Sequence, residues 1–222
     1  EDNGDHRSLL IQKDNTNSQN VTSPVVQSLP QVDMGDYHSL TSFVQWGVQN
    51  YPAKHYFIAV WNHGNGWHLQ NATGDMHAND ISWDDNSGNH ITTEQLGVAM
   101  GEAAKIIGHK VDIYGSDACL MAMAEVAGEM KDSVSVFVGS QETEPGDGWP
   151  YATFLADWAK NPAMTAQQVG ATLSKDYTNA YSGGIYGNQD VTFSAFDMSH
   201  YDSLVAAVKT LAVELKGLTG DQ

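Results

Sequence analysis

Apolar and polar residues follow one another along the chain in blocks that are typical of an α/β protein. Short, nearly continuous apolar runs rich in β-branched and aromatic residues predict buried strands. These runs span 55–61, 111–114 and 133–140. Between them, apolar residues recur at three- and four-residue intervals, which predicts amphipathic helices. The helices span 39–51, 96–107 and 120–130. Strands that alternate with helices indicate a layered α/β fold with a largely parallel sheet.

The same criteria predict further elements toward both ends. A short strand over 7–12 is followed by a polar surface loop over 13–23, and the polar connection 69–90 is expected to be exposed, with a hairpin around 81–83. Thr92 with Gln95 and Thr165 with Gln168 resemble capping boxes at helix starts. The remaining expected elements are helices over 154–158, 165–183 and 204–217 and a strand over 191–197.

Composition narrows the class of protein. The 222 residues fit one domain, and 27 acidic against 10 basic residues give a net charge of −17. Because such a surface repels phosphate backbones, we expect no nucleic-acid partner. The longest strongly apolar run, 56–61, is too short to span a membrane. The single cysteine allows no internal disulfide, and a start at Glu1 indicates a processed or trimmed chain.

Two residues with catalytic chemistry follow two predicted strands. His63 comes directly after the strand 55–61, and Cys119, the one cysteine, lies between the strand at 111–114 and the next predicted helix. We expect the first amides of that helix to lower the thiol pKa. A thiol and an imidazole at neighbouring strand ends are the parts needed for acyl transfer, and the amides of Gly64 and Cys119 can bind the developing oxyanion. The competing interpretation is that Cys119 is a small core hydrophobe.

Three ordered sequence blocks resemble the clostripain family of cysteine peptidases, within the wider caspase-like group. They are WNHGNGW (61–67), DACLM (117–121) and GSQETEPGDGWPY (139–151), with weaker matches at 22–26 and 32–36. The separation from His63 to Cys119 is 119 − 63 = 56 residues, near the spacing of roughly 50 in caspases. The resemblance implies a caspase-like three-layer sandwich with a mostly parallel sheet. It also implies a dyad of His63 and Cys119.

The resemblance further implies endopeptidase activity after Arg or Lys, with Asp117 and Asp147 forming the pocket for the basic side chain. Two buried carboxylates facing a guanidinium suit that task physically. Capping of the next helix and a turn before Gly148 are the structural alternatives for these two residues. A secreted or periplasmic bacterial location is implied as well. We expect one peptidase domain over 1–222 that lacks an N-terminal strand and helix of the family, so that one edge of the sheet is either missing or supplied by another chain.

Several alternatives stay open at this stage. No cofactor is expected to be required, although the acidic cluster at 80–86 allows calcium dependence. His63, His68 and His77 do not match a zinc motif. The rival functions are an inactive regulatory module, a glycan-binding module using tryptophans near loops (Trp61, Trp67, Trp83 and Trp149), and a transpeptidase. No Lys or Arg occurs from His55 to Ala104, so self-cleavage after a basic residue is not expected there.

Overall fold

The computed structural model describes residues 6–13, 21–67 and 80–219. Residues 14–20 of the expected loop over 13–23, the first half of the connection 69–90, and His68 and His77 therefore lie outside the described residues.

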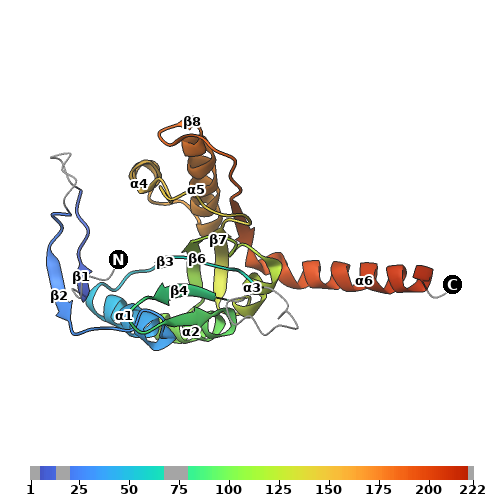
Figure 1. The fold of residues 1–222 in the computed structure, drawn as a ribbon, viewed down its shortest axis with the longest axis horizontal. Coiled ribbons are helices and arrows are strands. Elements are labelled where there is room, and N and C mark those ends of the chain that lie inside the picture. Colours follow the sequence, from blue (N-terminus) through green and yellow to red (C-terminus); the bar gives the residue numbers. More distant parts are fainter. Residues whose placement is uncertain (1–5, 14–20, 68–79, 220–222) are drawn as a thin grey trace.

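A four-stranded sheet forms the centre of the molecule (Figure 1). Its strands are β3 (Phe57–Trp61), β6 (Val111–Asp117), β7 (Val134–Gly139) and β10 (Ser194–Asp197), in the order β10-β7-β6-β3. β3, β6 and β7 run parallel, and β10 runs antiparallel to β7. The prediction of a mostly parallel sheet is confirmed. β6 and β7 are buried along most of their length, which explains their nearly continuous apolar sequence.

Helices cover both faces of the sheet, so the fold is a three-layer sandwich (Figure 1). α1 (Tyr37–Asn50), α2 (Thr93–Ile107) and α3 (Ala124–Glu129) lie on one face, and α4 (Tyr151–Lys160) and α5 (Ala166–Tyr181) lie on the other. Successive strand residues point to opposite faces. Tyr114 and Phe137 therefore enter the first core, while Ile113 and Val136 enter the second.

Both predicted capping boxes are present. The Thr92 side chain accepts a hydrogen bond from the Gln95 amide and the Gln95 side chain accepts one from the Thr92 amide, and Thr165 with Gln168 repeats the arrangement. Each pair satisfies amides that have no partner in the first helical turn. The starts of α2 and α5 were therefore readable from local sequence.

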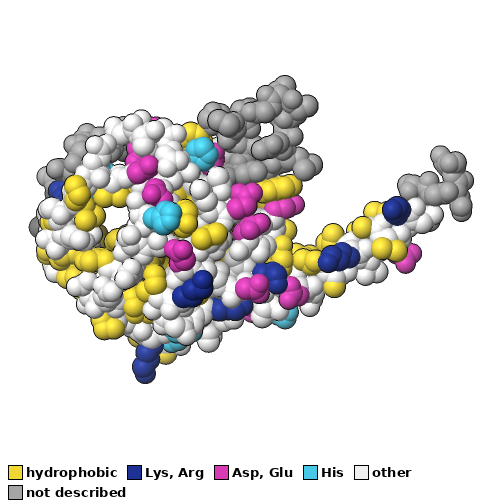
Figure 2. Space-filling model, turned by 90° about the horizontal axis from the view of Figure 1, so that it is seen from below, with side chains coloured by type: hydrophobic (Ala, Val, Ile, Leu, Met, Phe, Trp, Pro, Cys, Tyr) yellow, Lys and Arg dark blue, Asp and Glu magenta, His cyan; other side chains and the backbone are white. Residues whose placement is uncertain are grey.

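Three hairpins and a C-terminal helix surround the sandwich. The hairpins pair β1 (His6–Leu9) with β2 (Val25–Leu29), β4 (Asp80–Asp84) with β5 (Asn89–Thr92), and β8 (Ser182–Gly184) with β9 (Gly187–Asn188). After the short turn η1 (Met198–His200), α6 (Tyr201–Thr219) projects away from the body. Figure 2 shows hydrophobic side chains along α6. α6 also continues through Gly217, where the sequence had predicted its end.

Two predicted boundaries near Cys119 are wrong. β6 continues through Gly115 and Ser116 to Asp117, because Gly115 pairs on both sides in the sheet. The next helix begins at Ala124 instead of Leu120, whose φ is +63°. The chain between them is held by hydrogen bonds to the segment that follows β7, from the Leu120 amide to the Glu142 carbonyl (3.0 Å) and from the Ala122 amide to the Ser140 carbonyl (2.9 Å).

Other boundaries differ by a few residues. β1 is shorter than its predicted strand, β10 begins at Ser194 instead of 191, and α4 extends beyond the predicted 154–158 on both sides. Among the described residues, no helix combines the length and apolar character that a membrane span requires.

Candidate active site

The register of the sheet brings His63 and Cys119 to the same edge. In the parallel pair β3–β6, Trp61 lies opposite Asp117, and the Asn62 amide donates to the Asp117 carbonyl at 3.3 Å. His63 and Cys119 each follow two residues later. The two segments remain in contact there, since a Cβ on Gly64 would lie only 2.7 Å from the Cys119 carbonyl oxygen. Both predicted catalytic residues therefore leave adjacent strands at matching positions.

The loop that carries His63 is fixed against β4. The Asn62 side chain accepts a hydrogen bond from the Trp83 amide (2.9 Å) and donates one to the Trp83 carbonyl (3.3 Å). The same Asn62 oxygen accepts the His63 amide at 2.7 Å. The Asn65 amide then donates to the Asp80 carbonyl at 3.0 Å. These bonds hold the backbone on both sides of His63 while its side chain stays exposed.

The Cys119 thiol is half-buried and faces Glu144. The Glu144 amide donates to Cys119 Sγ with nitrogen and sulfur 3.2 Å apart, and Sγ lies 3.9 Å from the Glu144 carbonyl oxygen. Because α3 begins only at Ala124, the expectation that the thiol lies near the first amides of a helix is wrong. The single amide of Glu144, which belongs to a loop, takes that place.

Two backbone amides at this edge have no partner among the described residues. The bridge between Gly64 and Ile81 is closed by the Asn65 amide, so the Gly64 N–H is left over. The ladder between β3 and β6 ends with the Asn62 amide on Asp117. If the ladder continued, the Cys119 N–H would donate to the Asn62 carbonyl, but the described part of the chain does not form that bond. Free amides at Gly64 and Cys119 are the donors that an oxyanion hole requires.

Asp117 is buried beside a second acid, Glu144. Asp117 is 3% exposed, and the Tyr151 hydroxyl donates to its Oδ2 at 2.7 Å. The Trp149 indole N–H donates to Glu144 Oε1 at 3.4 Å. Burial raises the pKa of both carboxyl groups, and the neighbouring Asp117 helps to raise that of Glu144 to about 9. Burial and mutual repulsion therefore disfavour the state in which both carboxyl groups are charged.

Asp147, which the resemblance implied to join Asp117 in a pocket, follows Glu144 by three residues. It is exposed on a turn in which the Gly148 amide donates to the Pro145 carbonyl at 3.0 Å. Burial, and then the charge of Asp147, raise the pKa of Tyr186. Asp147 therefore lies near Tyr186, and its own side chain is exposed.

Sequence reasoning missed three residues of this cluster: Glu144, Tyr151 and Tyr177. Tyr177 lies on α5 and is fully buried. Its pKa is raised first by burial and then by the nearby groups Glu144, Tyr181, Asp117 and Cys119. Glu144 and Tyr151 lie in the block GSQETEPGDGWPY, so that block already contained the residues that could have been proposed from sequence. Tyr177 comes from a distant helix whose pattern indicated only core packing.

Asp84, one of the residues considered for calcium, is engaged by backbone amides. Asp84 accepts hydrogen bonds from the amides of Met34, Asn86 and Ser87, of which the Ser87 bond contributes most to lowering its pKa. In the part of the chain that the structure describes, no group of three or more His, Cys, Asp or Glu side chains is arranged to hold a metal ion.

The four tryptophans considered for glycan binding differ in exposure. Trp149 is 2% exposed and packs in the core, whereas Trp61 is 70% exposed at the end of β3. Trp67 and Trp83 are half-buried, and Trp67 packs against the other core.

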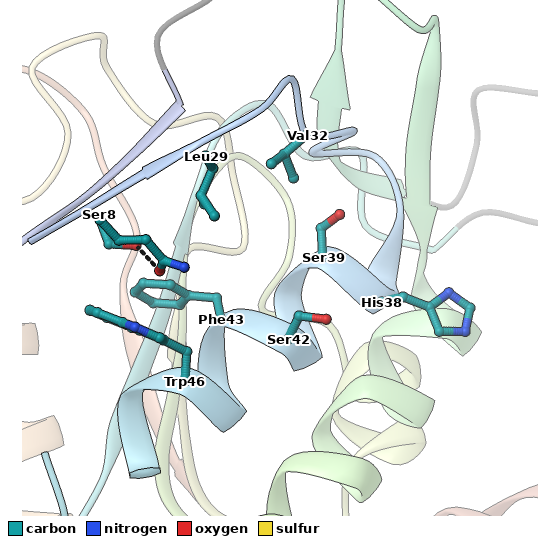
Figure 3. Close-up of a pocket in the computed structure, with 9 residues that line it drawn as sticks. Ser8, Leu29, Val32, His38, Ser39, Ser42, Phe43 and Trp46 are labelled. Carbon is teal, nitrogen blue, oxygen red and sulfur yellow. Dashed lines mark hydrogen bonds between the residues drawn. The ribbon is translucent and has the colours of Figure 1, made fainter. Parts of the chain in front are cut away.

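A groove of about 330 Å³ lies elsewhere, between the β1–β2 hairpin and α1 (Figure 3). Phe43 and Trp46 of α1 face Leu29 and Ser8 of the hairpin across it. The predicted site residues do not line this groove, so the candidate active site rests on the strand ends.

Comparisons with known proteins agree with the fold and the motifs. The sequence profile described as the Clostripain family matches residues 4–221. Clostripain of Hathewaya histolytica is 28% identical over 211 residues, covering 83% of this chain and 39% of that protein. The chain thus spans well under half the length of this curated relative.

Solved structures give the same fold. A secreted C11 cysteine protease from Bacteroides thetaiotaomicron, in complex with an irreversible peptide inhibitor, superposes with a TM-score of 0.73 at 20% identity. The match covers 92% of this chain and 56% of that one. An inactive zymogen C11 protease from Parabacteroides distasonis gives 0.63 at 20% identity, covering 87% and 49%. The three-layer sandwich is therefore the caspase-like fold, and the chain belongs to the clostripain family of cysteine peptidases.

Proposed function

We propose that this chain is the catalytic part of a cysteine endopeptidase that cleaves after Arg or Lys. The observation that carries the proposal is the register of β3 and β6, which sets Trp61 opposite Asp117 and so leaves His63 and Cys119 at matching positions beyond the strand ends. Family membership makes the same chemistry the first expectation.

In the proposed reaction, Cys119 Sγ attacks the carbonyl carbon of the scissile peptide bond as a thiolate. The carbonyl oxygen becomes an oxyanion, which the free amides of Gly64 and Cys119 stabilise. His63 takes up the thiol proton and delivers it to the leaving amine, so that a thioester remains on Cys119. Water, deprotonated by His63, then attacks the thioester, and the acid product leaves with Cys119 restored.

Basic specificity is supported by the acids around the nucleophile. Asp117 lies two residues before Cys119 and is buried, while Asp147 stands on the exposed side of the same cluster. A buried carboxylate gains most from a cation that arrives with its own hydrogen-bond donors, and a guanidinium or ammonium group supplies both. The strongly acidic protein would also attract basic segments of substrates.

Initial rates on fluorogenic peptides that end in Arg, Lys, Asn or Asp test this proposal, with Cys119→Ala as the control. Cleavage after Arg or Lys that disappears in the variant is the expected result. Cleavage only after Asn or Asp would retain the dyad and reject the acidic pocket. Equal rates in the variant would reject Cys119 as the nucleophile.

The proposed reaction needs no metal ion, because His63 performs the proton transfers and the thiolate is itself a strong nucleophile. The carboxylate of Asp84, considered as a calcium ligand, is already bonded to three amides. We therefore propose that addition of calcium, or of a chelator such as EGTA, leaves the rate unchanged. A rate that depends on calcium would contradict this.

We also propose that residues 1–222 act as one peptidase domain whose sheet another polypeptide extends at β3. β3 pairs with β6 on one side, and no described strand pairs with its other side. An exposed apolar edge strand is a ready template for pairing. Sedimentation at several concentrations tests this, since a strictly monomeric chain with unprotected β3 amides in hydrogen exchange would contradict it.

The secreted relatives of known structure make secretion the expected location.

A further inference from the structure

Two buried polar atoms beside Asp117 have no hydrogen-bond partner among the described residues. They are Glu144 Oε2 and the hydroxyl oxygen of Tyr177. Both side chains belong to the cluster around Asp117, since Asp117 helps to raise the pKa of each group, after burial. Buried polar atoms are nearly always paired in native proteins, so two orphans in one cluster indicate a ligand that supplies the missing contacts.

The charge of the cluster indicates which kind of ligand. Asp117 comes from the end of β6, Glu144 from the loop after β7, Tyr151 from α4, and Tyr177 from α5. Apart from burial, the groups that shift the pKa of Glu144 are Asp117 and Trp149, and neither is a cation. Two neighbouring buried carboxyl groups accept a cation readily, because its positive charge offsets their mutual repulsion and favours the ionised form of both.

The position of Glu144 ties this cluster to the nucleophile. Its amide donates to Cys119 Sγ at 3.2 Å, while its carboxyl group adjoins Asp117. A substrate whose carbonyl carbon reaches Cys119 thus has its neighbouring side chain within reach of Glu144. Asp147, by contrast, is exposed.

We propose that Glu144 is a specificity-determining residue, which pairs with Asp117 to bind the cationic side chain on the acyl side of the cleaved bond. This inference rests on the function proposed above and adds Glu144 to the pocket in which the resemblance placed Asp117 and Asp147. A guanidinium group has donors enough for both carboxylates, and the partly exposed ring of Tyr151 provides a face that attracts a cation. On binding, Glu144 releases its proton to solvent, and its carboxylate receives the N–H donors of the substrate.

Titration calorimetry in the Cys119→Ala background tests the proposal without turnover. The probe is a peptide amide with one Arg at the cleavage position, titrated at neutral pH in buffers of different ionisation enthalpy. We expect release of nearly one proton per bound peptide. Glu144→Gln should abolish this release and weaken binding by roughly 10- to 100-fold, the usual cost of losing a hydrogen bond to a charged group.

Glu142→Gln is the matched control, because Glu142 lies in the same loop with an exposed side chain and makes its contact to Leu120 through the backbone. It should leave both affinity and proton release unchanged. In the active chain, Glu144→Gln should lower kcat/KM on Arg peptides by roughly 10-fold or more.

The outcomes separate the two proposals. If the native chain cleaves Arg peptides and Glu144→Gln cleaves them within about two-fold of that rate, Glu144 has no role in specificity and only this inference fails. Unchanged proton release in Glu144→Gln would overturn it in the same way. If the native chain neither binds nor cleaves Arg or Lys peptides, the proposed basic specificity itself fails.

Discussion

The side chain of Asn62 and the backbone of Trp83 form two hydrogen bonds, of 2.9 and 3.3 Å, one in each direction. Asn62 immediately precedes His63, and Trp83 lies in β4, which belongs to a separate hairpin. The pair therefore acts like one rung of a β-ladder, with an amide side chain in place of a backbone. It fixes the direction in which the chain leaves β3 and hence the position of His63.

Asn62→Ala should lower activity more than substrate affinity. The loss removes both bonds to Trp83 and the bond to the His63 amide, so the imidazole is no longer held in place. Misplacement of a catalytic group by about 1 Å can cost roughly 100-fold, so we expect kcat to fall by about 10- to 100-fold with KM changed little. Steady-state kinetics measures this. Asn50→Ala, which removes one bond at the exposed end of α1, serves as the control, and equal losses in the two variants would contradict the assignment.

Gly148→Ala should disturb the carboxyl pair of Asp117 and Glu144 and should also destabilise the fold. Gly148 has a φ of +62°, and an added Cβ would lie 3.2 Å from Asp117 Oδ1. Gly88 has a φ of +69° with open space around it. Gly88→Ala therefore strains the backbone to a similar extent but creates no side-chain clash. Both substitutions should destabilise the protein by about 1 kcal/mol. Only Gly148→Ala should reduce kcat/KM on Arg peptides, and a matching loss in Gly88→Ala would show a general effect of stability.

Glu144→Gln should change stability in a pH-dependent way. Burial and Asp117 raise the pKa of Glu144 from 4.5 to about 9 in the folded protein. Between these values the folded state keeps a proton that the unfolded state has lost, so wild-type stability falls as pH rises through this range. Gln cannot lose a proton, so its contribution to stability does not change over this range. The melting temperature of the variant relative to wild type should therefore rise from about pH 5 to about pH 8.

Glu142→Gln again provides the comparison for this measurement, because its side chain is exposed. Its melting temperature relative to wild type should vary little with pH. A constant difference between Glu144→Gln and wild type across the pH range would mean that Glu144 is ionised in the folded protein.

Much of the fold was predictable because its signals are local. Apolar runs located β3, β6 and β7, and the capping boxes at Thr92 and Thr165 located the starts of α2 and α5. The edge of the sheet that carries His63 and Cys119 followed from strand order. The error after Cys119 arose because Leu120 joins a helical pattern in sequence while its backbone bonds to Glu142 from another segment.

The side chains that surround the Asp117–Glu144 pair could not be predicted from local sequence. Glu144 and Asp147 lie three residues apart in one loop, and which of them turns inward depends on the turn from Pro145 to Gly148. Tyr177 reaches the cluster only because α5 packs over that face of the sheet. Similarly, the apolar pattern of α6 predicted a helix correctly, but the pattern could not show that residues such as Val208 stay exposed.

Covalent labelling tests the central claim most directly, because Cys119 is the only cysteine of the chain. The chain is treated with a peptidyl acyloxymethyl ketone that carries Lys at the reactive end, and its intact mass is measured. We predict one adduct located on Cys119 in the native chain, slower labelling in His63→Ala, and none in Cys119→Ala. An adduct on another residue, or labelling of Cys119 at the same rate without His63, would contradict the proposed dyad.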